Sequence, residues 1–341
     1  MRSARAGTLR GMPHRAALVS GTFFALAAGL MWGLVFVAPL LLADYPAVLL
    51  SFARYLAFGL IALPLGWLDR RRLAQLTRAD WLEALKLSLV GNLAYYVCVA
   101  AAVQRAGAPL PTMIVGTLPV VIAVSSNLRD HARDGRLAWA RLAPSLLLIA
   151  AGIGCVNQAE FARLGAAGSS SDGAARYAIG ALFAVGAVVC WTWYPLRNAD
   201  WLRAHKDRSP STWATAQGLA TLPLALLGFS GFWAWNQLSG QAFEMPLGPA
   251  PLRFVGLMLA LGLLASWLGT LCWNEASQRL PTTLTGQLIV FETLSALAYA
   301  FMLRGQMPVP LTLLGVLLLV AGVVCALHTR PAPLAAQGHA G

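Results

Sequence analysis

Two charged side chains interrupt the long apolar stretches of this sequence. Arg54 lies within residues 47–68, and Glu292 lies within residues 281–303. A charge at the centre of a bilayer costs about 2.5–3.5 kcal/mol on insertion scales, so neither side chain is expected to face lipid. Glu292 is a candidate for contacting a solute or exchanging a proton, and Arg54 for contacting an anion or a carboxylate. The alternative is structural, with the two residues paired to each other or to backbone carbonyls.

Aromatic and amide side chains in other apolar stretches extend this candidate site. Trp32 and Trp191 occupy matching places in two similar segments, and Asn92 and Tyr95 share one face of a predicted helix over residues 85–104. Gln287 precedes Glu292 by five residues. We predict that these residues line a path for a solute. The alternatives are hydrogen bonding between helices for the polar residues, and packing or an interfacial aromatic belt for the tryptophans.

Motifs of several other classes of protein are absent from the sequence. It has no HExxH zinc motif, no GxxxxGK[ST] phosphate loop and no GxSxG nucleophile elbow. The five histidines fall outside the centres of the apolar stretches, and the five cysteines lie within these stretches without a paired spacing. We therefore predict no catalytic residues, no metal site and no cofactor, and we do not expect an enzyme.

The composition indicates the elements that position these residues. The chain has 341 residues, of which 58% are hydrophobic and 11% are charged, whereas soluble domains carry about 25% charged residues. Because backbone groups in lipid must be paired within a segment, the apolar stretches are expected to be helical. The prediction is an all-α integral membrane protein with ten spans, at residues 18–42, 47–68, 85–104, 107–127, 139–157, 177–196, 211–231, 254–275, 281–303 and 308–328.

The distribution of basic residues predicts the orientation of these spans. The net charge is +12, from 25 basic and 13 acidic residues. If the N-terminus is cytoplasmic, 19 basic residues fall on the cytoplasmic side and five on the other, with Arg54 left inside a span. This bias predicts that both termini are cytoplasmic. Nucleic-acid binding is the alternative explanation of the charge, and we do not expect it because the basic residues lie in connections between spans.

The sequence also repeats itself in order. Residues 21–32 align without a gap on 180–191, with five identities in twelve positions, 98–105 align on 272–279, and 151–155 align on 321–325. Since five is an odd number of spans, the second half enters the membrane from the opposite side. The fold prediction is therefore an inverted repeat of two five-helix halves, the arrangement that supports alternating access around a site at the midplane.

This repeat predicts the division of the chain. A basic cytoplasmic N-terminus covers residues 1–17, the first five-helix repeat covers 18–157, an external linker covers 158–176, the second repeat covers 177–328, and a cytoplasmic tail covers 329–341. The linker is expected from its run of glycine and serine residues.

Taken together, the ten predicted spans and their motifs resemble the EamA type of the drug/metabolite transporter superfamily. The similarity rests on Leu30-Met31-Trp32-Gly33 with Phe36 in the first span, Ser51-Phe52-Ala53-Arg54-Tyr55 in the second, and Phe291-Glu292-Thr293 in the ninth. The chain departs from the family's pattern at Thr293, where a proline is usual. The resemblance implies a transporter of the bacterial inner membrane that exports amino acids, their derivatives or other metabolites, often against proton movement.

The function predicted from the sequence is secondary active export of a small metabolite by alternating access. The expected partners are the small-molecule solute and the lipid bilayer, with protons as an open alternative for coupling and with no nucleic acid. A passive channel or facilitator, or a membrane scaffold without transport activity, are the competing predictions. The sequence leaves the solute, the coupling ion and the oligomeric state open.

Overall fold

The regular structure of the described chain is helical throughout. The computed structural model describes residues 14–42, 44–106, 111, 114–129, 138–164, 171–240, 243–305 and 307–328, and contains no strand in these ranges. Up to residue 164, the helices are α2 (His14–Gly33), the 3₁₀ segment η1 (Leu34–Phe36), α3 (Val37–Leu41), α4 (Ala47–Leu68), α5 (Arg70–Leu73), α6 (Arg78–Leu87), the π-helical segment η2 (Ser88–Ala94), α7 (Tyr95–Ala106), α9 (Leu118–Leu128) and α10 (Trp139–Leu164).

The rest of the chain repeats this pattern of long helices. It contains α11 (Ser171–Ala204), α12 (Pro210–Leu238), α13 (Pro251–Ala260), the π-helical segment η4 (Leu261–Leu268), α14 (Gly269–Arg279), α15 (Thr282–Leu288), α16 (Val290–Arg304) and α17 (Pro310–His328).

Eight helices within the described residues are long and apolar enough to cross a membrane. They are Ala16–Pro39, Ala47–Leu68, Arg78–Val99, Trp139–Val156, Ala175–Ala204, Pro210–Leu238, Pro251–Arg279 and Thr282–Leu303. Two shorter apolar helices, Leu118–Leu128 and Pro310–Ala326, lie where the fourth and tenth spans were expected. The prediction of an all-α membrane protein is confirmed.

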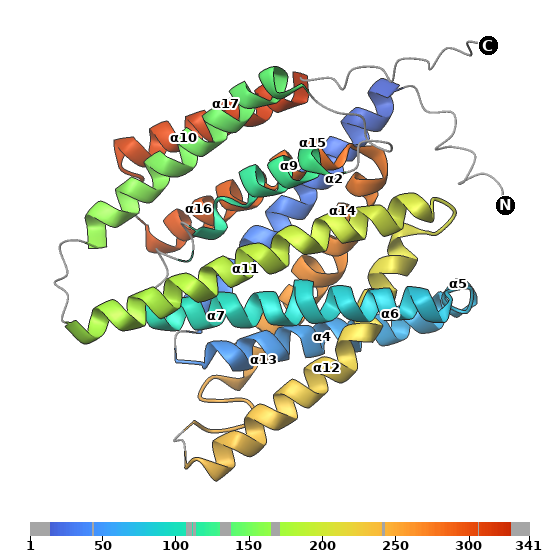
Figure 1. Ribbon diagram of the computed structural model, residues 1–341. Helices are drawn as coiled ribbons and strands as arrows, with labels where there is room; N and C mark the ends of the chain where they lie inside the picture. Colours follow the sequence, from blue (N-terminus) through green and yellow to red (C-terminus); the bar gives the residue numbers. More distant parts are fainter. Residues whose placement is uncertain are drawn as a thin grey trace.

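The helices pack in pairs that join distant parts of the chain. In Figure 1, α11 lies along α7, and α4 packs against α12. Both α14 and α16 pack on α2, and α15 packs on α9. Glycines permit the close approach of α2 and α16: a Cβ at Gly29 would lie 3.0 Å from the backbone nitrogen of Glu292, and one at Gly33 would lie 2.6 Å from Cβ of Ser295. Gly29 and Gly33, spaced as in a GxxxG motif, thus let the two helices approach closely.

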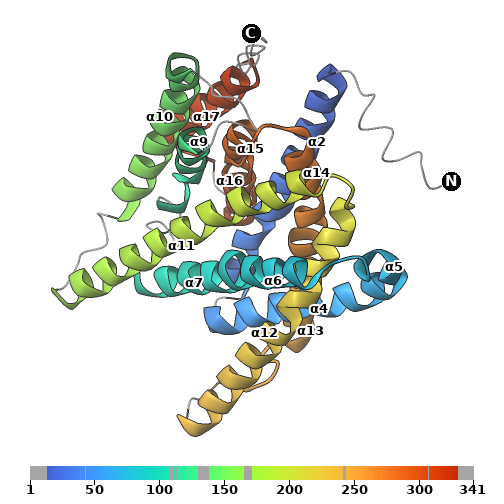
Figure 2. The ribbon, with the colours of Figure 1, turned by 45° about the vertical axis from the view of Figure 1, so that its right-hand side comes forward.

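Helices α10 and α17 form a separate pair at one edge of the bundle, and both views show this arrangement (Figures 1 and 2). These two helices therefore lie at the periphery of the bundle. Their contact depends on small residues, because a Cβ at Gly152 would lie 2.7 Å from the carbonyl oxygen of Gly315 and 2.9 Å from the backbone nitrogen of Leu319.

Gly152→Val is therefore expected to separate α10 from α17. Overpacking a close contact costs about 1–3 kcal/mol, and here the obstructing atoms are backbone and do not move freely. The measurement is the thermal unfolding midpoint of the purified protein in detergent. Gly154→Ala on the same helix is the control, because a Cβ at Gly154 has no neighbour within 4 Å. Equal midpoints for the two variants would contradict this account of the helix pair.

Several boundaries differ from those predicted, mainly because polar residues continue the helices. The third span begins at Arg78 and not at 85, since Thr77 and Asp80 form a capping box that starts α6. The sixth runs through Ala204 and not to 196. Helices α10 and α11 both extend into the range 158–176 expected as a linker, and 165–170 lie outside the described residues. Of the expected terminal segments 1–17 and 329–341, only residues 14–17 are among the described residues.

The helix of the ninth predicted span is interrupted at one residue, Ile289. Helix α15 ends at Leu288 and α16 begins at Val290, so Glu292 lies in the first turn of α16. The free N–H groups of a first helical turn give a positive partial charge, which favours a carboxylate there. Only Ile289, whose backbone is itself helical, separates the two helices, and Thr282–Leu303 remains one of the eight apolar helices that agree with the predicted spans.

Candidate functional site

Aromatic side chains from four helices, α2, α7, α11 and α14, meet in one cluster. Trp32 contacts Trp191 edge to face, with ring centroids 5.3 Å apart, and lies 5.1 Å from the ring of Trp273. Tyr95 and Tyr194 stack on the ring of Trp191, with ring centroids 4.8 and 4.9 Å away. All five side chains are buried. We call these five residues the aromatic cluster, and the structure thus brings together the predicted site residues Trp32, Trp191 and Tyr95.

The indole groups of this cluster are not equivalent. Nε1 of Trp32 donates a hydrogen bond of 2.9 Å to the carbonyl oxygen of Ala265 in η4. Nε1 of Trp191 and Nε1 of Trp273 are buried and have no hydrogen-bond partner among the residues that the structure describes. A buried donor without a partner costs about 1–3 kcal/mol, so these two N–H groups differ in energy from that of Trp32.

Arg54 is held near the cluster by aromatic faces and a hydroxyl group. Its Nε donates to Oγ of Ser266 at 3.1 Å, and its guanidinium carbon lies 4.9 Å from the ring centroid of Tyr55 and 5.3 Å from that of Tyr96. The side chain is buried. Cation–π contacts of this kind stabilise a guanidinium in a buried position.

Glu292 lies deep in the bundle but keeps part of its surface accessible. Arg54 and Tyr95 are near enough to interact with its carboxylate electrostatically. No salt bridge joins Arg54 to Glu292, both of which are described, so their direct pairing is not formed in this structure. A carboxylate that is surrounded by protein yet accessible can exchange a proton or bind a cation.

Asn92 and Gln287 make contacts away from the aromatic cluster. Asn92 Nδ2 donates to Oγ1 of Thr221 at 3.3 Å, which joins η2 to α12. Gln287 Nε2 donates to Oγ of Ser145 at 3.2 Å, which joins α15 to α10. In this structure, both amides bond between helices, as the alternative interpretation of these residues expected.

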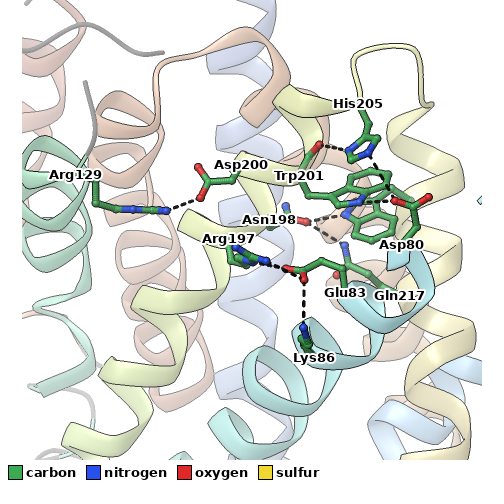
Figure 3. Close-up of polar contacts among 11 residues, drawn as sticks. Asp80, Glu83, Lys86, Arg129, Arg197, Asn198, Asp200, Trp201, His205 and Gln217 are labelled. Atoms are coloured by element: carbon green, nitrogen blue, oxygen red, sulfur yellow. Dashed lines mark hydrogen bonds and ion pairs between the residues drawn. The ribbon is translucent and has the colours of Figure 1, made fainter. Parts of the chain in front are cut away.

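A second group of polar residues joins α6 to α11 (Figure 3). Arg197 makes two hydrogen bonds to the Glu83 carboxylate, at 2.5 and 3.2 Å. Asp80 accepts a hydrogen bond of 2.9 Å from Nε1 of Trp201, and its Oδ1 lies 3.7 Å from Nε2 of His205. We call these five residues the polar cluster. It closes the bundle at the end that holds α5.

Buried amides connect the polar cluster to the aromatic cluster. Asn198 Oδ1 accepts hydrogen bonds from Trp213 Nε1 at 2.8 Å and from Gln217 Nε2 at 3.1 Å. Asn198 Nδ2 donates to Asn274 Oδ1 at 2.8 Å, and Gln217 Oε1 accepts from the Tyr194 hydroxyl at 2.9 Å. The network therefore joins Tyr194 of the aromatic cluster, through Gln217 of α12, to Asn198. Asn198 lies on α11 within one turn of Arg197 and Trp201 of the polar cluster.

Comparison with known proteins places this arrangement in a family. The model of the EamA-like transporter family matches residues 19–156. A protein of Escherichia coli (strain K12), inner membrane protein YtfF, is 54% identical over 314 residues, which are 92% of this chain and 97% of the relative. The chain belongs to the EamA-like transporter family. The predicted resemblance is confirmed, and membership points to a family of membrane transporters and not to an enzyme.

The fold of this EamA-like chain also occurs in a solved crystal structure. That structure matches with a TM-score of 0.67 over 90% of this chain and 97% of its own, at 19% sequence identity. At this identity, the likeness concerns the fold alone.

Sequence reasoning missed most of the polar cluster of this EamA-like protein. Glu83 and Arg197 fell outside the predicted spans, where charged residues are ordinary, and so carried no signal of their own. The spacing of Asp80 and Glu83, which places both on one helical face, was an available signal. It required the knowledge that the third helix begins at Arg78. Trp273 was missed because its matching position in the first half is Val99.

Asn198→Ala is expected to destabilise this EamA-like fold. The change leaves Trp213 Nε1 and Asn274 Oδ1 without the partners described above, at a cost of about 1–3 kcal/mol for each buried group. Thr192→Val on the same helix is the control, since the Thr192 hydroxyl is buried without a partner and its loss should be neutral or stabilising. Thermal unfolding in detergent measures both. Equal losses for the two variants would contradict the role of the amide network.

Proposed function

We propose that this protein is a secondary active transporter that exports small metabolites such as amino acids or their derivatives. It has ten membrane-spanning helices in two inverted halves, 18–157 and 177–328, and works by alternating access. The family model ends at residue 156, which supports a division at that point. The two shorter helices, α9 and α17, supply the fourth and tenth spans of this proposal.

The packing of the helices supports the inverted repeat. In the ten-span scheme, α2 on α14 is the first span on the eighth, and α11 on α7 is the sixth on the third. Exchanging the halves converts each of these contacts into the other. The contacts α4 with α12, α9 with α15 and α10 with α17 each convert into themselves. A pattern that is unchanged by this exchange is what a two-fold relation between the halves produces.

The π-helical segments support the same relation. The offset of 174 positions that relates Cys98 to Cys272 moves η2 (Ser88–Ala94) to within one residue of η4 (Leu261–Leu268). A π-helical turn is rare and is concentrated at functional sites. Both segments border the centre of the bundle: a Cβ at Gly91 in η2 would meet the ring of Tyr194, and Ala265 in η4 accepts the hydrogen bond from Trp32.

The offset of 174 positions also relates the two ends of the bundle, which must open alternately in the proposed mechanism. It places Phe254 opposite Asp80 of the polar cluster. Phe254 stacks on Tyr45 with ring centroids 4.9 Å apart, and the Tyr45 hydroxyl donates to the carbonyl of Leu247 at 2.8 Å. One end is therefore closed by ionic contacts and the other by aromatic ones. Rocking of the halves would break each set in turn.

The observation that carries the proposed function is the aromatic cluster with Glu292 and Arg54 beside it. Trp32 and Trp191, which occupy matching positions in the two halves, contact each other at the centre of the bundle. A site placed there changes its access whenever the halves move. The exposed part of Glu292 and the unpartnered indole N–H groups give this site its polar chemistry.

This chemistry suits a small solute with both an ammonium group and a carboxylate. Aromatic faces and the Glu292 carboxylate favour a cation. The Arg54 guanidinium and the indole N–H groups favour a carboxylate, with the guanidinium able to form charge-assisted hydrogen bonds. Amino acids and their derivatives carry both groups.

The membrane placement is part of the proposal. The name of the Escherichia coli relative and the apolar helices support the bacterial inner membrane as the location. Helix α2 begins and α17 ends on the side of the bundle that holds α5 (Figure 1). Arg70, Arg71 and Arg72 lie at this end. We assign it to the cytoplasm, with both termini inside.

Counterflow in proteoliposomes tests the proposed function. Vesicles that contain the protein are preloaded with an unlabelled mixture of amino acids and diluted into traces of labelled ones. An exchanger accumulates a label transiently, and the accumulation saturates and requires the preload. Flux that needs no preload and does not saturate would instead indicate a passive channel. No flux for any amino acid or N-acyl derivative, with folded protein present, would contradict this solute class.

A further inference from the structure

An open groove lies on the lipid-facing side of the bundle, away from the aromatic cluster. It has a volume of about 520 Å³ and is lined by Leu63, Gly66, Trp67, Arg70, Leu73, Ala74, Trp81 and Leu219. These residues belong to α4, α5, α6 and α12, which meet at the α5 end of the bundle (Figure 2). The volume lies within the range of ligand sites, about 300–1,000 Å³.

The walls of the groove are apolar and continue along a membrane-spanning helix. Leu60, Leu63 and Trp67 follow one another along one face of α4, with exposed fractions of 48, 48 and 70%. Gly66 lies at the bottom of the groove and has no side chain to fill it. A Cβ at this position would lie only 3.0 Å from Cδ1 of Leu219. The groove therefore extends the lipid-facing surface of α4 inward, and an alkyl chain that lies along α4 can enter it.

The mouth of the groove is basic. Arg70 lines it, with its guanidinium carbon 4.7 Å from the ring centroid of Trp67, and the next residue, Arg71, is exposed. Within the described residues, neither arginine forms a salt bridge. Tryptophan at the end of a span is typical of the level of lipid head groups. The charges therefore lie at the depth where a lipid phosphate would be found.

The neighbouring acidic groups already have partners. Asp69 accepts a hydrogen bond from the Thr212 hydroxyl and lies 3.6 Å from Arg72. Asp80 is buried and accepts from Trp201. The charge left for an external partner at this mouth is positive, and arginine binds phosphate oxygens well.

We propose that this groove binds an anionic phospholipid, with one acyl chain between α4 and α12 and the phosphate at Arg70 and Arg71. The occupant is a lipid and not a free phosphate, because the cavity behind the arginines is apolar. It is also not the transported solute, because Trp81, Leu219 and the other lining residues take no part in the aromatic cluster. The proposal depends on the chain spanning a membrane and is independent of the transport activity.

Native mass spectrometry of the delipidated protein tests this site with phosphatidylglycerol and phosphatidylcholine as probes. We expect phosphatidylglycerol to bind the wild type more tightly than phosphatidylcholine. Near an anionic lipid, each arginine contributes about fivefold in affinity. R70Q/R71Q should therefore lower the affinity for phosphatidylglycerol about 25-fold and change that for phosphatidylcholine little. Arg253→Gln is the matched control, since this exposed arginine lies at the opposite end of the bundle.

Two further measurements distinguish a lipid from its head group. Ala74→Trp fills the groove without changing its charge and should weaken the binding of both lipids, while thermal unfolding shows that the variant remains folded. Glycerophosphoglycerol, which lacks acyl chains, should not compete. Competition by this head group at equal concentration would show a phosphate site only and overturn the proposal. An unchanged affinity for phosphatidylglycerol in folded R70Q/R71Q would also overturn it.

Discussion

Glu292→Gln is expected to abolish uptake driven by a pH gradient in proteoliposomes while counterflow of the same solute persists. Glutamine keeps the size and the polarity of the side chain but neither ionises nor exchanges a proton. If Glu292 carries the coupling proton, the variant can still exchange solute for solute, because exchange does not require net proton movement. The carboxylate is suited to this role by its place in the first turn of α16, by its partial exposure and by having no salt-bridge partner within the described residues.

The competing role of Glu292 is direct contact with an ammonium group of the solute. In that case, counterflow falls together with coupled uptake. A charge-assisted hydrogen bond of about 1.5–3 kcal/mol corresponds to a loss of roughly ten- to a hundredfold in affinity. Glu244→Gln is the control, because Glu244 is exposed and lies outside the spans. Coupled uptake that is unchanged in Glu292→Gln, relative to this control, would exclude both roles.

Hydropathy predicted the architecture well because lipid restricts the backbone so strongly. Most described residues of the predicted apolar stretches are helical, and eight of the helices are long and apolar enough to cross a membrane. Hydropathy could not predict where helices end outside the apolar stretch. Thr77 caps α6, and Arg197 and Trp201 bond to its side chains, so local hydrogen bonds extend both helices beyond the predicted ends.

The candidate site was predicted in part for a related reason. A charge in a span is conspicuous, so Arg54 and Glu292 were found, and the repeat identified Trp32 and Trp191 as a pair. The sequence did not reveal that no direct salt bridge joins the two charges, because Arg54 instead contacts Ser266 and Tyr96, which lie on other helical segments, and the neighbouring Tyr55. Nor did it separate Asn92 and Gln287 from the site. Amides that join helices and amides that line a path have the same composition.

Trp32→Ala is expected to cost about 3–5 kcal/mol of stability, as large truncations in a packed core do. Trp32 contacts both Trp191 and Trp273 and bonds to the backbone of η4, so its loss removes packing between three helices. Trp32→Phe keeps an aromatic ring but removes the hydrogen bond to Ala265. This bond should account for about 0.5–1.5 kcal/mol. Unfolding of each variant by heat or denaturant in detergent measures these losses.

Trp191→Phe is the matched variant, because the same change at the matching position removes an N–H that has no partner in the protein. It should lose less stability than Trp32→Phe, since no protein hydrogen bond is broken. If the N–H binds the solute, as proposed, Trp191→Phe should instead raise the solute concentration at half-maximal counterflow. Although the two residues are equivalent in the repeat, Trp32→Phe should therefore mainly lower stability, and Trp191→Phe should mainly weaken solute binding. Equal effects of both variants on both measurements would show that the tryptophans only pack, and the aromatic cluster would no longer be a candidate solute site.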